Sequence, residues 1–309
     1  MGALAPAAAS TTRRRQTALQ DVWRHRLDYL FISPFYILFG IFGLYPLAWA
    51  LYLSFNRWSG FGDMRWVGLD NYIAMLSEET TIKALVNSLI FTAVLVPTGV
   101  FLALLFATLL NIRGLRGRGI YRTIYFLPFL TSTVIVGIVF QMLFDDTYGW
   151  INGALKLLGI PTVSWLSSAA PAKIAVMSLT HWQGLGYSTL IMLGGLQSLP
   201  REVYESAEID GAGPWSKFWS ITVPLMRPVM LFVAITKTIA VLNMFEQPYI
   251  LTRAGPEYQT LTMTYRLYDL AFLTTRYGDG AALGYLIAGI VIAVSLINLR
   301  LLRSWRDAS

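Results

Sequence analysis

The stretch Glu205-Ser206-Ala207-Glu208-Ile209-Asp210-Gly211-Ala212 is a charged, glycine-broken segment in an otherwise apolar chain, and Ile221-Thr222-Val223-Pro224 follows it after a short gap. Long apolar segments lie on both sides of it. A polar segment between two apolar runs is typical of a loop that joins two membrane spans. The side of the membrane on which this loop lies therefore sets the orientation of the whole chain.

The composition indicates a membrane protein. Of the 309 residues, 55% are hydrophobic and 13% are charged, and the mean hydropathy is +0.55, which is too apolar for a soluble surface. The basic residues behind the net charge of +7 are scattered among apolar runs, a pattern that disfavours nucleic-acid binding. The absence of cysteine excludes disulfides, Cys-based zinc sites and thiol nucleophiles.

The predicted fold class is all-α, a polytopic membrane protein with six transmembrane helices, because a span needs about 20 apolar residues. The predicted spans are 29–56, 84–112, 123–144, 174–199, 229–251 and 281–299. Residues 157–172 are rich in Gly, Pro, Ser and Thr, and are expected to form an interfacial or short re-entrant segment. We predict four parts: a tail (1–27), the first span with an external segment (28–83), a five-span core (84–300, with its loop at 200–228) and a tail (301–309).

The distribution of Lys and Arg predicts the topology. With the N-terminus inside, the cytoplasmic segments hold 15 of the 24 basic residues and the external segments hold 8, although the external segments are longer. The positive-inside rule therefore places both termini and the loop at 200–228 in the cytoplasm.

The loop itself is expected to contain two helices. Ser198 is a possible N-cap, Pro200 suits a first turn, and Gly211 is expected to end the helix before a second one begins at Pro214. A surface helix resting on lipid headgroups is one interpretation, but such helices usually carry a basic polar face and this one is mostly acidic.

The identities of the residues in the loop give a more specific indication than its polarity. The string from Tyr204 to Ala212, with Ile221 and Pro224, resembles the E-A-A…D-G-A…I-x-x-P signature of permease subunits of binding-protein-dependent ABC importers, in its carbohydrate and glycerol-phosphate (maltose-transporter-like) branch. Further stretches agree with this resemblance from about residue 28 to 300. Ser206 stands where the family usually has alanine, and Arg253-Ala254-Gly255-Pro256 replaces the commoner Thr-Gly-Gly-Pro pattern.

The resemblance implies a type I importer permease of a prokaryotic cytoplasmic (inner) membrane, whose loop helix sits in a cleft of an ATPase subunit. It also implies a second permease subunit, expected to be different from this one, and an extracytoplasmic solute-binding protein. Glu205 is the expected partner of a basic group on the ATPase. The docking residues carried over by position are Glu205, Ser206, Ala207, Asp210, Gly211, Ala212, Ile221 and Pro224.

Polar residues at membrane depth indicate a solute pathway by default. Lys237 has three open interpretations: a contact with the companion permease, attraction of an anionic solute, or a structural contact with carbonyl groups. Glu246→Ala is predicted to reduce transport without impairing assembly. The proposed pathway residues, some of which could instead be interface anchors, are Trp182, Tyr187, Lys237, Asn243, Phe245, Glu246 and Tyr249.

Other functions find little support in the sequence. The two histidines, His25 and His181, cannot form a multi-histidine metal site, and His181 with Ser188 lacks a paired acid for hydrolase chemistry. The chain has no G-x-x-x-x-G-K-[ST] loop, so no cofactor is expected and ATP with its Mg²⁺ belongs to a partner. A secondary transporter or channel for a small polar solute is the alternative, although paired halves and a second intramembrane carboxylate are missing.

Overall fold

The computed structural model describes residues 26–112 and 114–306, so most of the predicted N-terminal tail and the last three residues lie outside the described residues. The chain divides into two compact units, Met1–Tyr52 and Leu53–Ser309.

The first apolar run forms helix α2 (Arg26–Phe39), a π-helical turn η1 (Gly40–Leu44) and helix α3 (Tyr45–Ser54). The π turn precedes Pro46, which has no backbone N–H for the helical ladder, and here the N–H of Tyr45 bonds the carbonyl of Gly40. Residues Arg26–Ser54 are long and apolar enough to cross a membrane, in agreement with the predicted first span.

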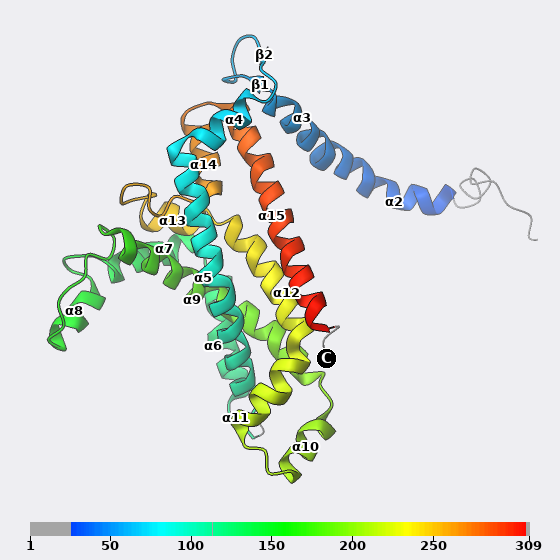
Figure 1. The fold of residues 1–309 in the computed structure, drawn as a ribbon, viewed down its shortest axis with the longest axis vertical. Coiled ribbons are helices and arrows are strands. Elements are labelled where there is room, and N and C mark those ends of the chain that lie inside the picture. Colours follow the sequence, from blue (N-terminus) through cyan, green and yellow to red (C-terminus); the bar gives the residue numbers. More distant parts are fainter. Residues whose placement is uncertain (1–25, 113, 307–309) are drawn as a thin grey trace, which may run out of the picture. The chain divides into compact units, whose positions relative to one another are not determined.

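The second unit is almost entirely helical, which confirms the all-α fold class (Figure 1). Its strands, β1 (Asn56–Arg57) and β2 (Arg65–Trp66), pair antiparallel over two residues each. Helix α5 (Glu79–Leu110) packs against α9 (Ala169–Gln197) and α12 (Val223–Leu242), and α12 packs against α15 (Tyr277–Arg306). The remaining elements are α4 (Asp70–Ser77), α6 (Arg118–Leu130), α7 (Thr133–Leu143), α8 (Trp150–Leu157), α10 (Arg201–Ile209), α11 (Pro214–Lys217), η2 (Phe218–Thr222), α13 (Glu246–Leu251), α14 (Met263–Tyr268) and η3 (Asp269–Leu273).

Four of the described helical segments are long and apolar enough to cross a membrane: Arg26–Ser54, Glu79–Leu110, Pro214–Leu242 and Tyr277–Arg300. The α6–α7 pair makes a fifth if a bent pair is one span. Helix α9 coincides with the predicted fourth span and has 29 residues, but it is not among these most apolar segments.

The predicted third span, 123–144, is wrong as a continuous helix, because α6 and α7 meet at an angle of 97°. Pro128 lies inside α6, where it removes a backbone donor and crowds the preceding turn, and the helix ends two residues later. The N–H and the side-chain hydroxyl of Thr131 both bond the carbonyl of Pro128 and close the end of α6.

The predicted fifth span, 229–251, overlaps the membrane-span candidate Pro214–Leu242, but its predicted C-terminal end is wrong, because α12 ends at Leu242 and α13 begins at Glu246. In a continuous helix the ring of Pro248 would clash with the carbonyl of Met244. The break frees that carbonyl, which accepts a hydrogen bond of 2.6 Å from the Thr262 hydroxyl. Lys237 and Glu246 therefore do not share one regular helix.

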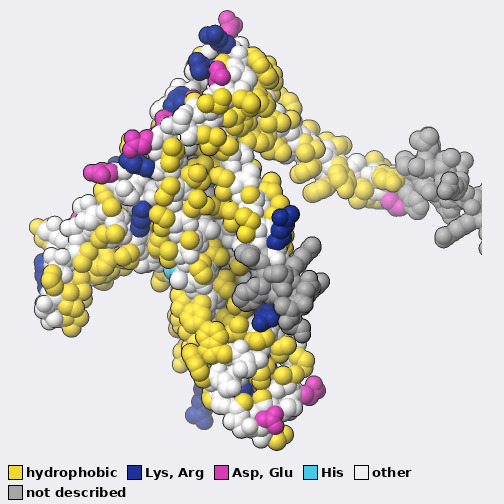
Figure 2. Space-filling model, viewed as in Figure 1, with side chains coloured by type: hydrophobic (Ala, Val, Ile, Leu, Met, Phe, Trp, Pro, Cys, Tyr) yellow, Lys and Arg dark blue, Asp and Glu magenta, His cyan; other side chains and the backbone are white. Residues whose placement is uncertain are grey.

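Hydrophobic packing joins the long helices in three buried clusters, centred on α5 with α9 and α12, on α14 with α15, and on α5 with the first half of α9 beside the α12–α13 break. Two glycines of α15 let neighbouring elements approach closely, since Gly280 faces Ala271 and Gly284 faces Leu267. Charged side chains gather near β1–β2 and near α10, whereas hydrophobic side chains cover much of the visible surface between them (Figure 2). This pattern suits a lipid environment.

An ion-pair network ties the start of α5 to α14. The guanidinium of Arg266, which is 8% exposed, binds Glu78 at 2.8 Å and also contacts Asp269. Arg276 lies 3.7 Å from the same Glu78 carboxylate. Burial alone would raise the pKa of Glu78, but the hydrogen bond and charge of Arg266, together with Arg276, outweigh burial and lower the pKa.

Glu78→Gln is therefore expected to destabilise the protein by about 1–2 kcal/mol at neutral pH, between the values for exposed and buried pairs. Because the folded-state pKa lies below the ordinary 4.5, this contribution is present above that pH and disappears as the pH falls through the folded-state pKa. Thermal unfolding in detergent from pH 7 down to pH 3 measures it. Glu79→Gln, whose carboxylate is 83% exposed, is the matched control. An equal loss of stability in the two variants would contradict the role of the network.

Candidate docking loop and membrane cavity

The loop between α9 and α12 has the predicted helix, glycine break and second helix. Gly211 has φ +79, the N–H of Ala212 bonds the carbonyl of Ala207, and the N–H of Gly211 bonds that of Glu208, which together form a Schellman C-cap. The predicted Ser198 N-cap is wrong: Ser198 terminates α9 and its hydroxyl bonds the carbonyl of Gly195, while Pro200 precedes α10.

Two side-chain contacts fix α10 to the segment that leads into α12. The Tyr204 hydroxyl lies 3.0 Å from the buried hydroxyl of Thr222 in η2. Lys217 of α11 forms a 2.9 Å ion pair with Glu208. These contacts brace α10 against the base of the long helix α12.

The opposite face of α10 is open. Glu205, Ser206, Asp210 and Gly211 of the predicted docking set are exposed. Ala207, Ala212, Ile221 and Pro224 are half-buried. The same surface presents two large apolar side chains outside the predicted docking set, Ile209 (87% exposed) and Trp215 (69% exposed). An exposed surface of acidic, small and apolar groups suits a protein partner better than solvent alone.

Tyr204→Phe and Thr222→Val each remove one side of the hydroxyl pair and are expected to loosen α10 by about 1 kcal/mol. Hydrogen exchange of the amides in α10 measures this loosening. The double variant should exchange no faster than the faster single variant, because the same contact is lost. Additive effects would show that the two hydroxyls act separately.

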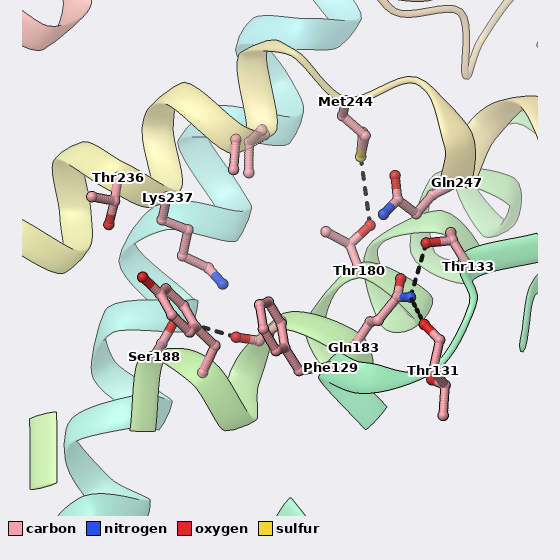
Figure 3. A pocket seen from close by; sticks show the side chains of 14 residues that line it. Phe129, Thr131, Thr133, Thr180, Gln183, Ser188, Thr236, Lys237, Met244 and Gln247 are labelled. Carbon is pink, nitrogen blue, oxygen red and sulfur yellow. Dashed lines mark hydrogen bonds between the residues drawn. The ribbon is translucent and has the colours of Figure 1, made fainter. Parts of the chain in front are cut away.

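A cavity of 380 Å³ lies between the α6–α7 break, α9 and α12 (Figure 3). Its walls combine hydroxyl and amide groups with aromatic rings and a single cationic side chain. The 14 lining residues are Phe129, Thr131, Thr133, Thr180, Gln183, Gly184, Tyr187, Ser188, Thr236, Lys237, Ala240, Val241, Met244 and Gln247.

Lys237 enters the cavity from α12 and is 8% exposed. The absence of a side chain at Gly99 of α5 makes room for it, because a Cβ there would lie 2.1 Å from Lys237 Cε. A Cβ on Gly184 would be 3.8 Å from Lys237 Nζ. Among the residues that the structure describes, no hydrogen bond or ion pair reaches this ammonium group.

Gln183 holds the α6–α7 break in place. Its side-chain amide donates to the hydroxyl of Thr133 at 2.9 Å and to the carbonyl of Thr131 at 3.3 Å. Its Oε1 atom is buried and has no hydrogen-bond partner among the described residues. One polar side chain thus supports the bent backbone and leaves an unused acceptor beside the cavity.

Of the predicted pathway residues, the cavity brings together Tyr187 and Lys237. The other five lie elsewhere: Trp182 packs on Phe140, Phe245 stacks on Tyr249, and Asn243 and Glu246 are exposed. The role proposed for Glu246 in transport stays a prediction. The sequence analysis missed Gln183, although an amide inside an apolar run was a visible signal.

Comparison with known proteins places the chain in a family. Residues 96–305 match the family described as the binding-protein-dependent transport system inner membrane component. The chain belongs to this family of ABC importer permeases, and it is a multi-pass component of the inner membrane.

Similar proteins include AraP, an arabinooligosaccharides transport system permease protein of Bacillus subtilis (strain 168), which is 35% identical over 94% of each chain. LacF, a lactose transport system permease protein of Rhizobium radiobacter, is 34% identical over 94% of this chain and 97% of its own. A chain from the crystal structure of a bacterial ABC transporter for the acidic polysaccharide alginate has the same fold, with a TM-score of 0.81, 24% identity, and coverage of 94% of this chain and 99% of that one.

Proposed function

We propose that this chain is the membrane-spanning permease subunit of an ATP-driven importer for a sugar or a related polyol or glycerol-phosphate, delivered by an extracytoplasmic binding protein. The relatives supporting the solute class include permeases named for arabinooligosaccharides, lactose, trehalose/maltose and sn-glycerol-3-phosphate. Helix α9 supplies the remaining span of a six-span topology with both termini in the cytoplasm. A second permease subunit, expected to differ from this one, completes the membrane channel.

The exposed face of α10 is the proposed docking surface for the ATPase, with Glu205 at its centre. The observation that carries this role is the bracing of α10 to the base of α12 through Tyr204–Thr222 and Glu208–Lys217. A displacement of α10 by a closing ATPase would therefore reach α12 and the side chains that α12 contributes to the cavity.

Glu205→Lys and Gly211→Val are expected to uncouple ATP hydrolysis from transport, with at least a tenfold fall in solute carried per ATP. The first reverses the charge on the docking surface, and the second places a β-branched residue at φ +79. The ratio of uptake to hydrolysis in proteoliposomes measures the effect.

Gly213→Val is the matched control for the glycine, because Gly213 has φ −70 and open space around its Cβ position. Glu257→Lys is the control for charge reversal at an exposed glutamate outside the loop. Normal coupling in both loop variants, with the complex assembled, would refute the docking role.

A secondary transporter or channel would not need the ATPase. Uptake is therefore measured in membranes with and without the cognate ATPase subunit. The importer function predicts that uptake disappears without the ATPase, and uptake that survives its loss would establish the alternative.

A further inference from the structure

We propose that the cavity around Lys237 is a binding site for an acidic saccharide, a sugar whose carboxylate or other anionic group pairs with Lys237 Nζ while a sugar hydroxyl donates to Gln183 Oε1. This inference rests on the proposed import function and specifies the solute more narrowly.

The first observation is the unbalanced positive charge of the cavity. A buried ammonium group is costly unless an anion or several acceptors surround it. Lys237 is 8% exposed, and none of the 14 lining residues is acidic. His181, which interacts with Lys237 electrostatically, cannot carry a negative charge and is bonded to Thr98 at 2.9 Å. The described residues thus leave the positive charge of Lys237 uncompensated, and an anionic ligand would supply the missing charge.

The second observation is the unpaired acceptor of Gln183. Both donors of its amide are used on the α6–α7 break, so the Gln183 side chain cannot turn over without breaking these bonds. Its buried, unpaired Oε1 can therefore pair only as an acceptor, and a ligand that pairs with it must present a donor such as a hydroxyl group. A bare inorganic anion would satisfy Lys237 and leave Gln183 unpaired.

The third observation is a pair of aromatic rings in the cavity wall. Phe129 and Tyr187 stack with their centroids 4.9 Å apart and both line the cavity. Figure 3 shows the Lys237 side chain extending from α12 toward the side of the cavity where Phe129 and Gln183 lie. An aromatic platform, hydroxyl-bonding groups and one cation in 380 Å³ fit a monosaccharide unit that bears a single negative charge.

A carboxylate from the companion permease could also neutralise Lys237. Such a side chain would not provide a hydroxyl donor for Gln183 Oε1 or an apolar ring face for Phe129. The saccharide accounts for all three features and is therefore the occupant that we propose.

The test measures binding of D-glucuronate and D-glucose to the assembled full-length complex in nanodiscs, by ligand-observed NMR without the binding protein. The wild-type complex is expected to bind glucuronate at least about tenfold more tightly than glucose, the effect of one charge-assisted hydrogen bond. Lys237→Met should remove this preference and Lys237→Arg should retain part of it. Gly99→Ala keeps the charge but displaces the ammonium group, and should weaken glucuronate binding selectively.

Lys173→Met is the matched control, because Lys173 also lies on a long helix but outside the cavity, and it should leave the preference unchanged. No binding of either sugar, equal binding of both, or a preference that persists in Lys237→Met would overturn the proposal. Dissociation of the permease pair in Lys237→Met would also overturn it, because Lys237 would then be paired with the companion subunit. ATP-driven uptake by the wild-type complex is measured in parallel, and its absence would instead refute the import function.

Discussion

The side-chain amide of Gln183 supports the feature on which the membrane cavity depends, the sharp break between α6 and α7. Lipid offers no hydrogen bonds to backbone groups, so a bent span persists only where protein groups replace those bonds. Gln183 does so for the backbone carbonyl of Thr131, and a second donation, to the side-chain hydroxyl of Thr133, also holds α9 beside the break. The space left by the bend, bounded by α12 on its other side, is the cavity that holds Lys237.

Helix α12 connects this cavity to the exposed loop. Its base is continuous with η2, where Thr222 contacts Tyr204 of α10, and its C-terminal half carries Thr236 and Lys237 into the cavity. In the importer that we propose, no separate relay is needed between the proposed docking surface and the proposed solute site, since α12 contacts both.

Local signals predicted the parts of this arrangement that local chemistry determines. Uncharged runs indicated the spans, and Gly211 and Pro214 predicted the broken loop. The two helix breaks depend on groups distant in sequence. A proline such as Pro128 either kinks or ends a helix, and Gln183, more than 50 residues later, stabilises the break. The break after α12 similarly depends on Thr262, whose hydroxyl donates to the carbonyl of Met244. Here Pro248 was a local sequence signal that a helix could not continue.

The predicted pathway residues also depended on contacts between segments distant in sequence, which local patterns do not reveal. They were predicted from residue type and membrane depth, and the break after Leu242 separates Asn243, Glu246 and Tyr249 from Lys237. Other elements supply the groups around Lys237: α9 provides the Gln183 amide, the α6–α7 break provides hydroxyl groups, and Gly99 of α5 provides the space for the side chain. Gly99 shows that a small residue has two uses in a membrane helix. Small residues let helices approach closely, and where the facing side chain is a lysine, as here, they also make room for a buried ammonium group.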